Sequence, residues 1–112
     1  MAKRFQDKEH LKWVRQQQCL IQKAGFYSCK GTVEAHHLLQ PNTGFRGGVK
    51  AGDDDTISLC RYHHSLLHTK YGTDKLFLEH YGLPENYGKE QARSLFKRKQ
   101  FIDLVKEDNL PF

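Results

Sequence analysis

The chain has 112 residues, of which 38% are hydrophobic and 28% charged, and its formal net charge is +5. This composition excludes a disordered chain, and the lack of any run of about 18 apolar residues excludes a membrane span. The positive charge favours an anionic partner, with nucleic acid the first candidate, although a basic surface that only keeps the protein soluble explains it equally well.

Nothing in the sequence marks a second domain, so we expect residues 1–112 to form a single one. The N-terminus has basic residues but no apolar stretch after them, which predicts no signal peptide and a cytoplasmic protein. In that reducing compartment, the three cysteines are expected to bind a metal rather than form a disulfide. A core this small would gain stability from a structural metal.

The first part of the chain predicts a helix, an irregular knuckle and a strand. Residues 7–18 mix apolar and charged side chains without Gly or Pro, which predicts a short amphipathic helix. Residues 19–31 contain two glycines and two of the cysteines and predict the knuckle. Residues 32–37 alternate loosely and end in His36 and His37, which predicts a strand.

The least regular stretch is 38–55, which is rich in glycine and contains Arg46 and Lys50. Long loops in small domains are usually functional or disordered. Because glycine lets a backbone approach a phosphate closely and the two cations supply charge, we favour a loop that contacts nucleic acid. A plain flexible loop is the alternative.

A second strand and a helix follow. Residues 56–60 are β-branched and alternating, which predicts a strand leading into a second group of histidines. The stretch 61–68 suits a helix, because His64 and His68 are four residues apart and share one face.

Two more helices are expected towards the C-terminus. Thr73 and Asp74 can cap the first, and Gly82 and Pro84 follow it as breakers. The last helix, about 88–108, has an apolar side and a basic side. The residues expected to be buried are Ala92, Leu95, Phe96, Ile102 and Val105. Those expected to be exposed are Lys89, Arg93, Lys97, Arg98 and Lys99, as a solvated face rather than a second DNA-contacting surface or partner interface.

One candidate metal site uses sulfur ligands. Its residues are Cys19, Cys29, Cys60 and His63. Three Cys and one His are an accepted tetrahedral set for structural zinc, and the two-residue gap from Cys60 to His63 lets one turn present both. The nine residues between Cys19 and Cys29 exceed the usual spacing. Three buried free cysteines are the alternative.

A second candidate site uses imidazoles from His36, His64 and His68. Two histidines on one helical face present two ligands, and His36 would complete three, leaving positions for water and a phosphate oxygen. His37 would then be the unbound neighbour that takes a proton from the attacking water. The alternative is a set of surface histidines with one or two core members.

The acidic run before the second strand offers a supporting group. One of Asp53, Asp54 and Asp55 can hydrogen-bond an imidazole and hold its tautomer. We choose Asp55 because it is closest to the strand. For Asp53 and Asp54, a solvated acidic turn explains the residues equally well.

Residues 34–38 and 55–64, read together, resemble the HNH endonucleases of the ββα-metal (His-Me finger) superfamily. The upstream segment 11–15 with Cys19 looks like the small phage-encoded branch, which includes recombination-enhancing nucleases. The similarity covers about residues 10–83. It implies an α+β fold with a ββα-metal core, a structural zinc knuckle and additional flanking helices. Either a phage or a cell could encode such a protein.

The resemblance also implies residue roles. His36 falls on a metal-ligand position and His37 on the general base, while His64 and His68 match further ligands. Asp55 falls where the family usually has Asn, and it brings a negative charge to that position.

The implied function is hydrolysis of DNA phosphodiester bonds with weak sequence specificity, using a divalent ion (Mg, Mn, Ni or Zn) beside the structural zinc. Arg46, Lys50, Arg61 and Lys70 are the expected phosphate contacts. Two other functions fit the same residues: a non-catalytic zinc-stabilised module that only binds DNA, and a histidine surface that joins copies through a metal.

Overall fold

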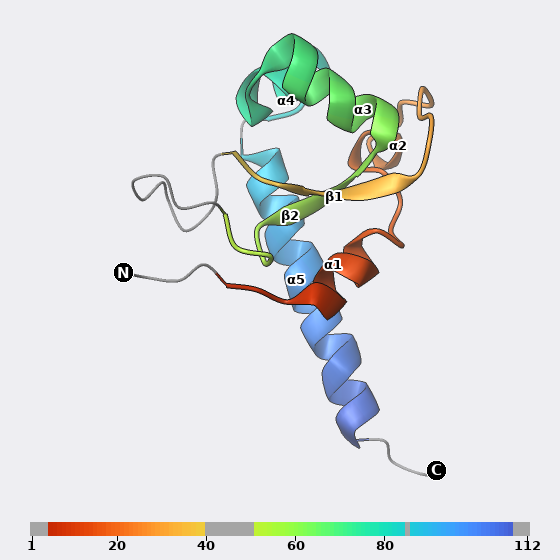
Figure 1. Cartoon of the computed structure of the whole chain (residues 1–112), viewed down its shortest axis with the longest axis vertical. Coiled ribbons are helices and arrows are strands. Elements are labelled where there is room, and N and C mark those ends of the chain that lie inside the picture. Colours follow the sequence, from red (N-terminus) through yellow and green to blue (C-terminus); the bar gives the residue numbers. More distant parts are fainter. Residues whose placement is uncertain (1–4, 40–50, 85, 109–112) are drawn as a thin grey trace.

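A computed structural model describes residues 5–39, 51–84 and 86–108. It shows a small α+β domain in which a two-stranded antiparallel sheet is surrounded by helices (Figure 1). The elements in chain order are α1 (Lys8–Val14), α2 (Leu20–Lys23), β1 (Val33–His37), β2 (Thr56–Cys60), α3 (Arg61–Leu66), a π-helical turn (Leu67–Tyr71), α4 (Asp74–His80) and α5 (Tyr87–Asp108). Both predicted strands are present, whereas the first helix ends earlier than expected and the knuckle contains the short α2.

The sheet determines which way the histidines point. In the antiparallel register His36 pairs with Ile57 and His37 with Thr56, so each pair shares one face of the sheet. Successive residues of a strand point to opposite faces. His36 and His37 therefore lie on opposite faces of the hairpin, and His36 shares its face with Ile57.

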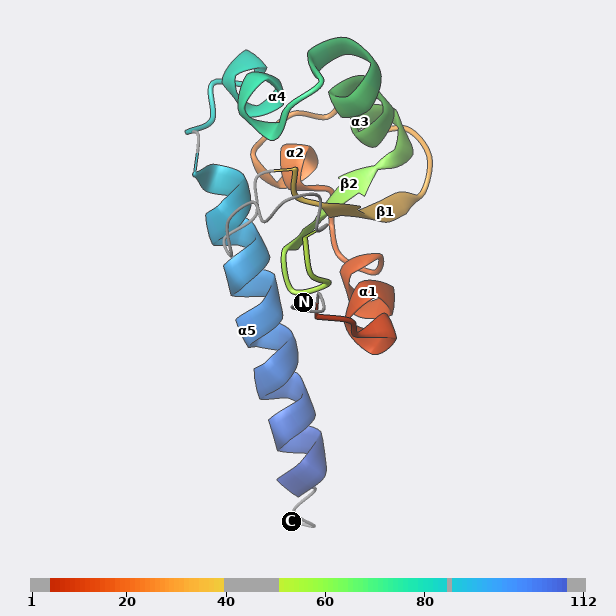
Figure 2. The ribbon, with the colours of Figure 1, turned by 60° about the vertical axis from the view of Figure 1, so that its left-hand side comes forward.

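Helices cover the hairpin from both sides. All of β2 is buried, whereas only His36 is buried in β1. α3 and α4 lie on one side, with α1 and the first half of α5 on the other (Figures 1 and 2). The core joins these layers through Phe77, Ile21, Ile57, Leu59 and Leu67, each at most 2% exposed.

The segment from β2 to α4 is shaped by local capping. The Cys60 sulfur accepts from the backbone N–H of His63 and so caps α3. The π-helical turn ends at Gly72, whose φ of 78° lies in the left-handed region that glycine adopts without strain. The Thr73 side chain then accepts from the Leu76 N–H at 3.2 Å, which confirms Thr73 as the cap of α4.

α5 extends beyond the domain. Its 22 residues span about 33 Å, and the distal half projects away from the other elements (Figure 1). Ala92 and Leu95 are buried as expected. The expected burial of Val105 is wrong, because this residue lies where α5 projects past the other helices and is 55% exposed. None of the described helices combines the length and apolar character that a membrane span requires.

The basic side of α5 is exposed only in part. Arg93, Lys97 and Arg98 are exposed as expected. The expected exposure of Lys99 is wrong: its side chain is 15% exposed, and its ammonium group donates to the Asp103 carboxylate at 2.6 Å.

Candidate metal centres

The four residues of the predicted sulfur site converge. Cys19 directly precedes α2, Cys29 lies in the knuckle, and Cys60 and His63 come from the junction of β2 and α3. Their ligand atoms all lie within 4.8 Å of one another. Cys19, Cys60 and His63 are buried and Cys29 is half-buried, so the set is closed from solvent on most sides. The structure thereby brings together the residues that the sequence predicted.

Two of the three sulfur–nitrogen distances in this cluster match those around a tetrahedral ion, and the third is shorter. Zn–S and Zn–N bonds of ordinary length set the S···N separations of a tetrahedral site at about 3.5–3.6 Å. His63 Nδ1 lies 3.6 Å from the sulfurs of both Cys19 and Cys29, and 3.1 Å from that of Cys60. A buried Cys₃His set with this spacing can bind a metal such as zinc.

The protonation states around His63 suit this role. The other ring nitrogen, Nε2, lies 3.0 Å from the Ser28 hydroxyl and donates to it when Nδ1 carries the lone pair. Burial lowers the pKa of His63, which favours the neutral ring that a metal needs. Burial, followed by contacts with Cys19 and Cys60, raises the pKa of Cys29 to about 12. The Cys29 thiol therefore resists ionisation until a cation compensates its charge. For Cys60, the effect of burial is outweighed by hydrogen bonds from the backbone N–H groups of His63 and Lys30, so the pKa of this thiol is lowered.

The three imidazoles of the second predicted site also converge. His36 Nδ1 lies 3.1 Å from His64 Nε2, and His68 Nε2 lies 3.2 Å from the same atom. An ion held by imidazoles at ordinary bond lengths separates its nitrogens by about 3.3–3.4 Å in a tetrahedral site. His36 is buried, His64 half-buried and His68 exposed, so the cluster opens to solvent on the side of His68.

Carboxylates behind two of these imidazoles direct their lone pairs inward. His36 Nε2 lies 2.9 Å from Asp74 Oδ1, and His64 Nδ1 lies 2.8 Å from Glu34 Oε1. A carboxylate accepts the ring N–H, so the opposite nitrogen of each ring is left unprotonated and faces the other imidazoles.

Asp74, the carboxylate behind His36, and His68, the third imidazole, are also suited to metal binding. The Asp74 carboxylate accepts from the backbone N–H of Leu39 at 2.6 Å, which fixes its position. Burial, together with the neighbouring His36 and His64, lowers the pKa of His68 and favours its neutral form.

His37 is set apart from the three converging rings. Its side chain is 32% exposed, and its Nε2 lies 2.7 Å from Oδ1 of Asp53, whose side chain is 4% exposed. The second carboxylate oxygen of Asp53 accepts from the backbone N–H of Asp7 at 2.7 Å, and the Asp53 N–H donates to the carbonyl of Phe5 at 2.8 Å. The N-terminal segment thus holds a buried carboxylate against an accessible imidazole.

The acidic run differs in part from expectation. The carboxylate bonded to His37 is that of Asp53, not that of Asp55, which sequence reasoning had chosen. Asp55 is buried, and its backbone carbonyl accepts from the Leu38 N–H at 2.9 Å, so it ties the end of β1 to the start of β2. Its catalytic role stays a prediction.

Sequence reasoning missed Ser28 and Glu34 as supports and assigned Asp74 only to helix capping. Since each of these residues reaches its histidine across the fold, no local pattern could have identified the pairs.

The predicted phosphate contacts are described only in part. Arg61 and Lys70 are exposed at the start of α3 and in the π-helical turn. Arg46 and Lys50 lie outside the described residues.

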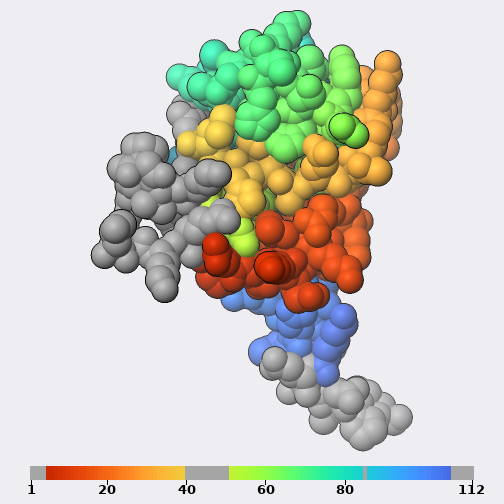
Figure 3. Space-filling model, in the orientation of Figure 1, coloured from red at the N-terminus to blue at the C-terminus, as the bar shows by residue number. Residues whose placement is uncertain are grey.

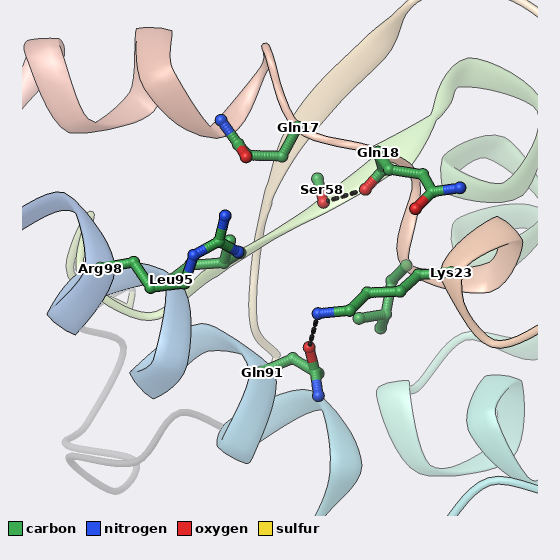
Figure 4. A pocket seen from close by; sticks show the side chains of 8 residues that line it. Gln17, Gln18, Lys23, Ser58, Gln91, Leu95 and Arg98 are labelled. Atoms are coloured by element: carbon green, nitrogen blue, oxygen red, sulfur yellow. Dashed lines mark hydrogen bonds between the residues drawn. The ribbon is translucent and has the colours of Figure 1, made fainter.

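A separate cavity of about 280 Å³ lies between α5, β2 and the connection from α1 to α2 (Figure 4). Glutamine amides, Lys23 and Arg98 line it, and no candidate ligand does.

No protein-family model matches this chain, and searches of curated proteins and of solved structures found no match either.

Proposed function

We propose that this protein is a metal-dependent endonuclease of the HNH (ββα-metal) type, which hydrolyses phosphodiester bonds in DNA. One observation carries the proposal. Three imidazole nitrogens converge within 4.8 Å with carboxylates behind two of the rings, and the next residue after one of them, His37, is accessible and paired with a buried Asp53. Ligands for a divalent ion and an oriented general base are the parts that hydrolysis of a phosphodiester requires.

His36, His64 and His68 would hold the divalent ion, and Asp74 and Glu34 would keep their rings oriented. When bound, the ion supplies stabilisation of the negative charge that develops on the phosphate oxygens. His37 accepts the proton of the attacking water at a ring nitrogen. Asp53 fixes the orientation of that ring and stabilises the positive charge that it gains.

The Cys₃His cluster has a structural role in this proposal. It connects the knuckle to β2 and α3, and α3 carries the imidazole ligand His64. A closed set of four ligands offers no open position for substrate, which distinguishes it from the histidine set.

A cleavage assay tests the proposal. The purified protein is incubated with supercoiled plasmid and Mg²⁺, Mn²⁺, Ni²⁺ or Zn²⁺, alongside His37→Ala and the matched control His80→Ala. His80 is exposed on α4 and lies outside both clusters, so its loss should leave cleavage unchanged. We expect His37→Ala to reduce the rate by about 10²–10⁴-fold, the usual contribution of a general base, while the metal content stays the same. Equal rates for both variants would exclude the assigned role of His37.

A non-catalytic zinc-stabilised DNA-binding module is the second candidate, favoured by the buried Cys₃His cluster, which needs no catalytic partner. It predicts DNA binding without cleavage in all four metals. The third possibility, a metal shared between copies, is disfavoured because His36 is 2% exposed and bonded to Asp74.

A further inference from the structure

The knuckle and the start of α3 form one continuous surface. The Tyr62 N–H donates to the carbonyl of Lys30 at 3.1 Å, and the Arg61 N–H donates to that of Thr32 at 2.9 Å. Gly31 permits this approach, because a Cβ at that position would lie 2.9 Å from the Cβ of Arg61. Figure 3 shows the orange knuckle and the green start of α3 adjoining on one face.

Two tyrosines on this surface are exposed beyond what the fold requires. Tyr27 is 85% exposed and Tyr62 39%. The residues that follow the two tyrosines, Ser28 and His63, are in contact, since the Ser28 hydroxyl lies 3.0 Å from His63 Nε2. A ring as open as that of Tyr27 adds little to the core and leaves its face free to stack on a ligand.

The two segments that form this surface carry positive charge only, although the ammonium group of Lys23 is directed away, to the Gln91 side chain on α5 at 3.3 Å. The segments 19–33 and 60–73 contain four cations and no acidic residue. The cations are Lys23, Lys30, Arg61 and Lys70, all exposed. The ammonium group of Lys30 lies 5.7 Å from the centre of the Tyr62 ring, so positive charge stands directly beside an aromatic face. The nearest acid in sequence, Glu34, has its carboxylate bonded to His64.

We infer that Tyr27, Lys30, Arg61 and Tyr62, here called the tyrosine patch, bind a single-stranded nucleic acid. Exposed rings interleaved with cations bind unpaired strands, since every base offers a face for stacking and every linkage a negative charge. A duplex keeps its bases stacked on one another, and an acidic peptide lacks them, so neither uses the rings.

The tyrosine patch borders the candidate active site. Arg61 precedes the candidate ligand His64 by three residues on α3, and residues at this spacing are neighbours on one face of a helix, so a strand held by Arg61 would run towards the histidine set. As a statement about which DNA is cut, the inference rests on the proposed nuclease function. Binding itself is measurable without cleavage.

Fluorescence anisotropy tests the inference with the full zinc-loaded chain in buffer without added divalent ions. The probes are a short labelled single-stranded DNA, its duplex and the equivalent RNA. We expect the single strand to bind more tightly than the duplex. Tyr27→Ala and Tyr62→Ala should each weaken binding by about 5- to 150-fold, the effect of losing one stacked base, whereas Tyr62→Phe should bind normally. The matched control is Phe101→Ala, which removes a ring that is 68% exposed on α5. Metal content measured on each variant verifies that the knuckle is intact.

Salt dependence separates the cations from the rings. Lys30→Gln and Arg61→Gln should each reduce the slope of log K against log salt by about 0.7, the value for one contact with a single strand. Tyr27→Ala should weaken binding without changing this slope. Tyrosine-dependent binding of either single strand supports the patch. A preference for DNA or RNA names the ligand, and similar affinities mean that the patch accepts both.

Three outcomes would overturn the inference: a duplex that binds as tightly as the single strand, a Phe101→Ala loss equal to that of Tyr27→Ala, or polyglutamate that competes as well as the oligonucleotide. The outcomes of this test differ from those of the nuclease test. Binding that depends on the tyrosine patch, without any cleavage, would exclude only the proposed nuclease function. Cleavage of single-stranded DNA at the same rate by the parent protein and the tyrosine variants would exclude only the tyrosine patch.

Discussion

Replacing Asp53 by asparagine tests how the accessible histidine is oriented. The Asp53 carboxylate accepts from His37 Nε2 through one oxygen and from the Asp7 N–H through the other, each at 2.7 Å. Asparagine has a single acceptor oxygen, so Asp53→Asn can keep only one of these contacts. Either an amide N–H faces the Asp7 N–H, or it faces His37 and imposes the other tautomer.

We expect cleavage to slow by about 10- to 100-fold, the usual effect of losing a carboxylate that orients an imidazole. This loss should be smaller than that of His37→Ala, because a misoriented base still retains part of its function. The free energy of unfolding should fall by about 1.5–3 kcal/mol through the lost charge-assisted bond to the backbone. Asp54→Asn, one residue along, is the matched control and should cut at the normal rate.

The assay is the initial rate of plasmid nicking at saturating metal, measured for both single variants and for the double variant. If Asp53 acts through His37, adding Asp53→Asn to His37→Ala should cause no further loss. Losses that multiply would refute the reasoning, because they would mean that the two residues act independently.

Three further predictions concern metal binding and stability. Cys29→Ser should abolish zinc binding at the sulfur site. It should lower the melting temperature by more than removal of the ion from the histidine site does, because a structural ion contributes folding free energy. Equal melting temperatures for Cys29→Ser and the parent protein would contradict this. Asp74→Asn should weaken metal binding at the histidine set by about 10- to 100-fold in a calorimetric titration, with the sulfur site unaffected. His10→Phe should stabilise the protein by about 1 kcal/mol at neutral pH, since His10 is fully buried and neither ring nitrogen has a hydrogen-bond partner in the described part of the chain. Burial is the main cause that lowers the pKa of His10 in the folded protein. On acidification the imidazole is therefore protonated first in the unfolded chain, and the free energy of unfolding falls as the pH drops below about 6.5. His10→Phe should reduce this pH dependence in urea unfolding, and the same pH dependence in both proteins would argue against the reasoning.

The features that sequence could predict are those with a short-range signal. β1 and β2 follow from alternation, and the four-residue spacing of His64 and His68 predicted their common face on a helix. Cys and His are the usual protein ligands of transition metals, so both ligand sets were predictable from residue type, even though Cys19 lies far from His63 in the chain.

Other features depend on contacts between distant segments. Asp53 rather than Asp55 bonds to His37 because backbone groups of Phe5 and Asp7, from the N-terminal segment, hydrogen-bond to Asp53 and fix its position. Neither alternation nor spacing carries that information. The exposure of Val105 likewise depends on where the neighbouring helices end, since the apolar pattern of α5 continues past the point where the domain can cover it.

Metal stoichiometry tests the central claim, two separate ligand sets in one small domain, most directly. Native mass spectrometry of zinc-saturated protein should find two ions per chain, and His68→Ala should lose one while the ion of the sulfur site remains. A single ion in the parent protein that His68→Ala leaves in place would contradict the histidine centre, and with it the proposed hydrolysis.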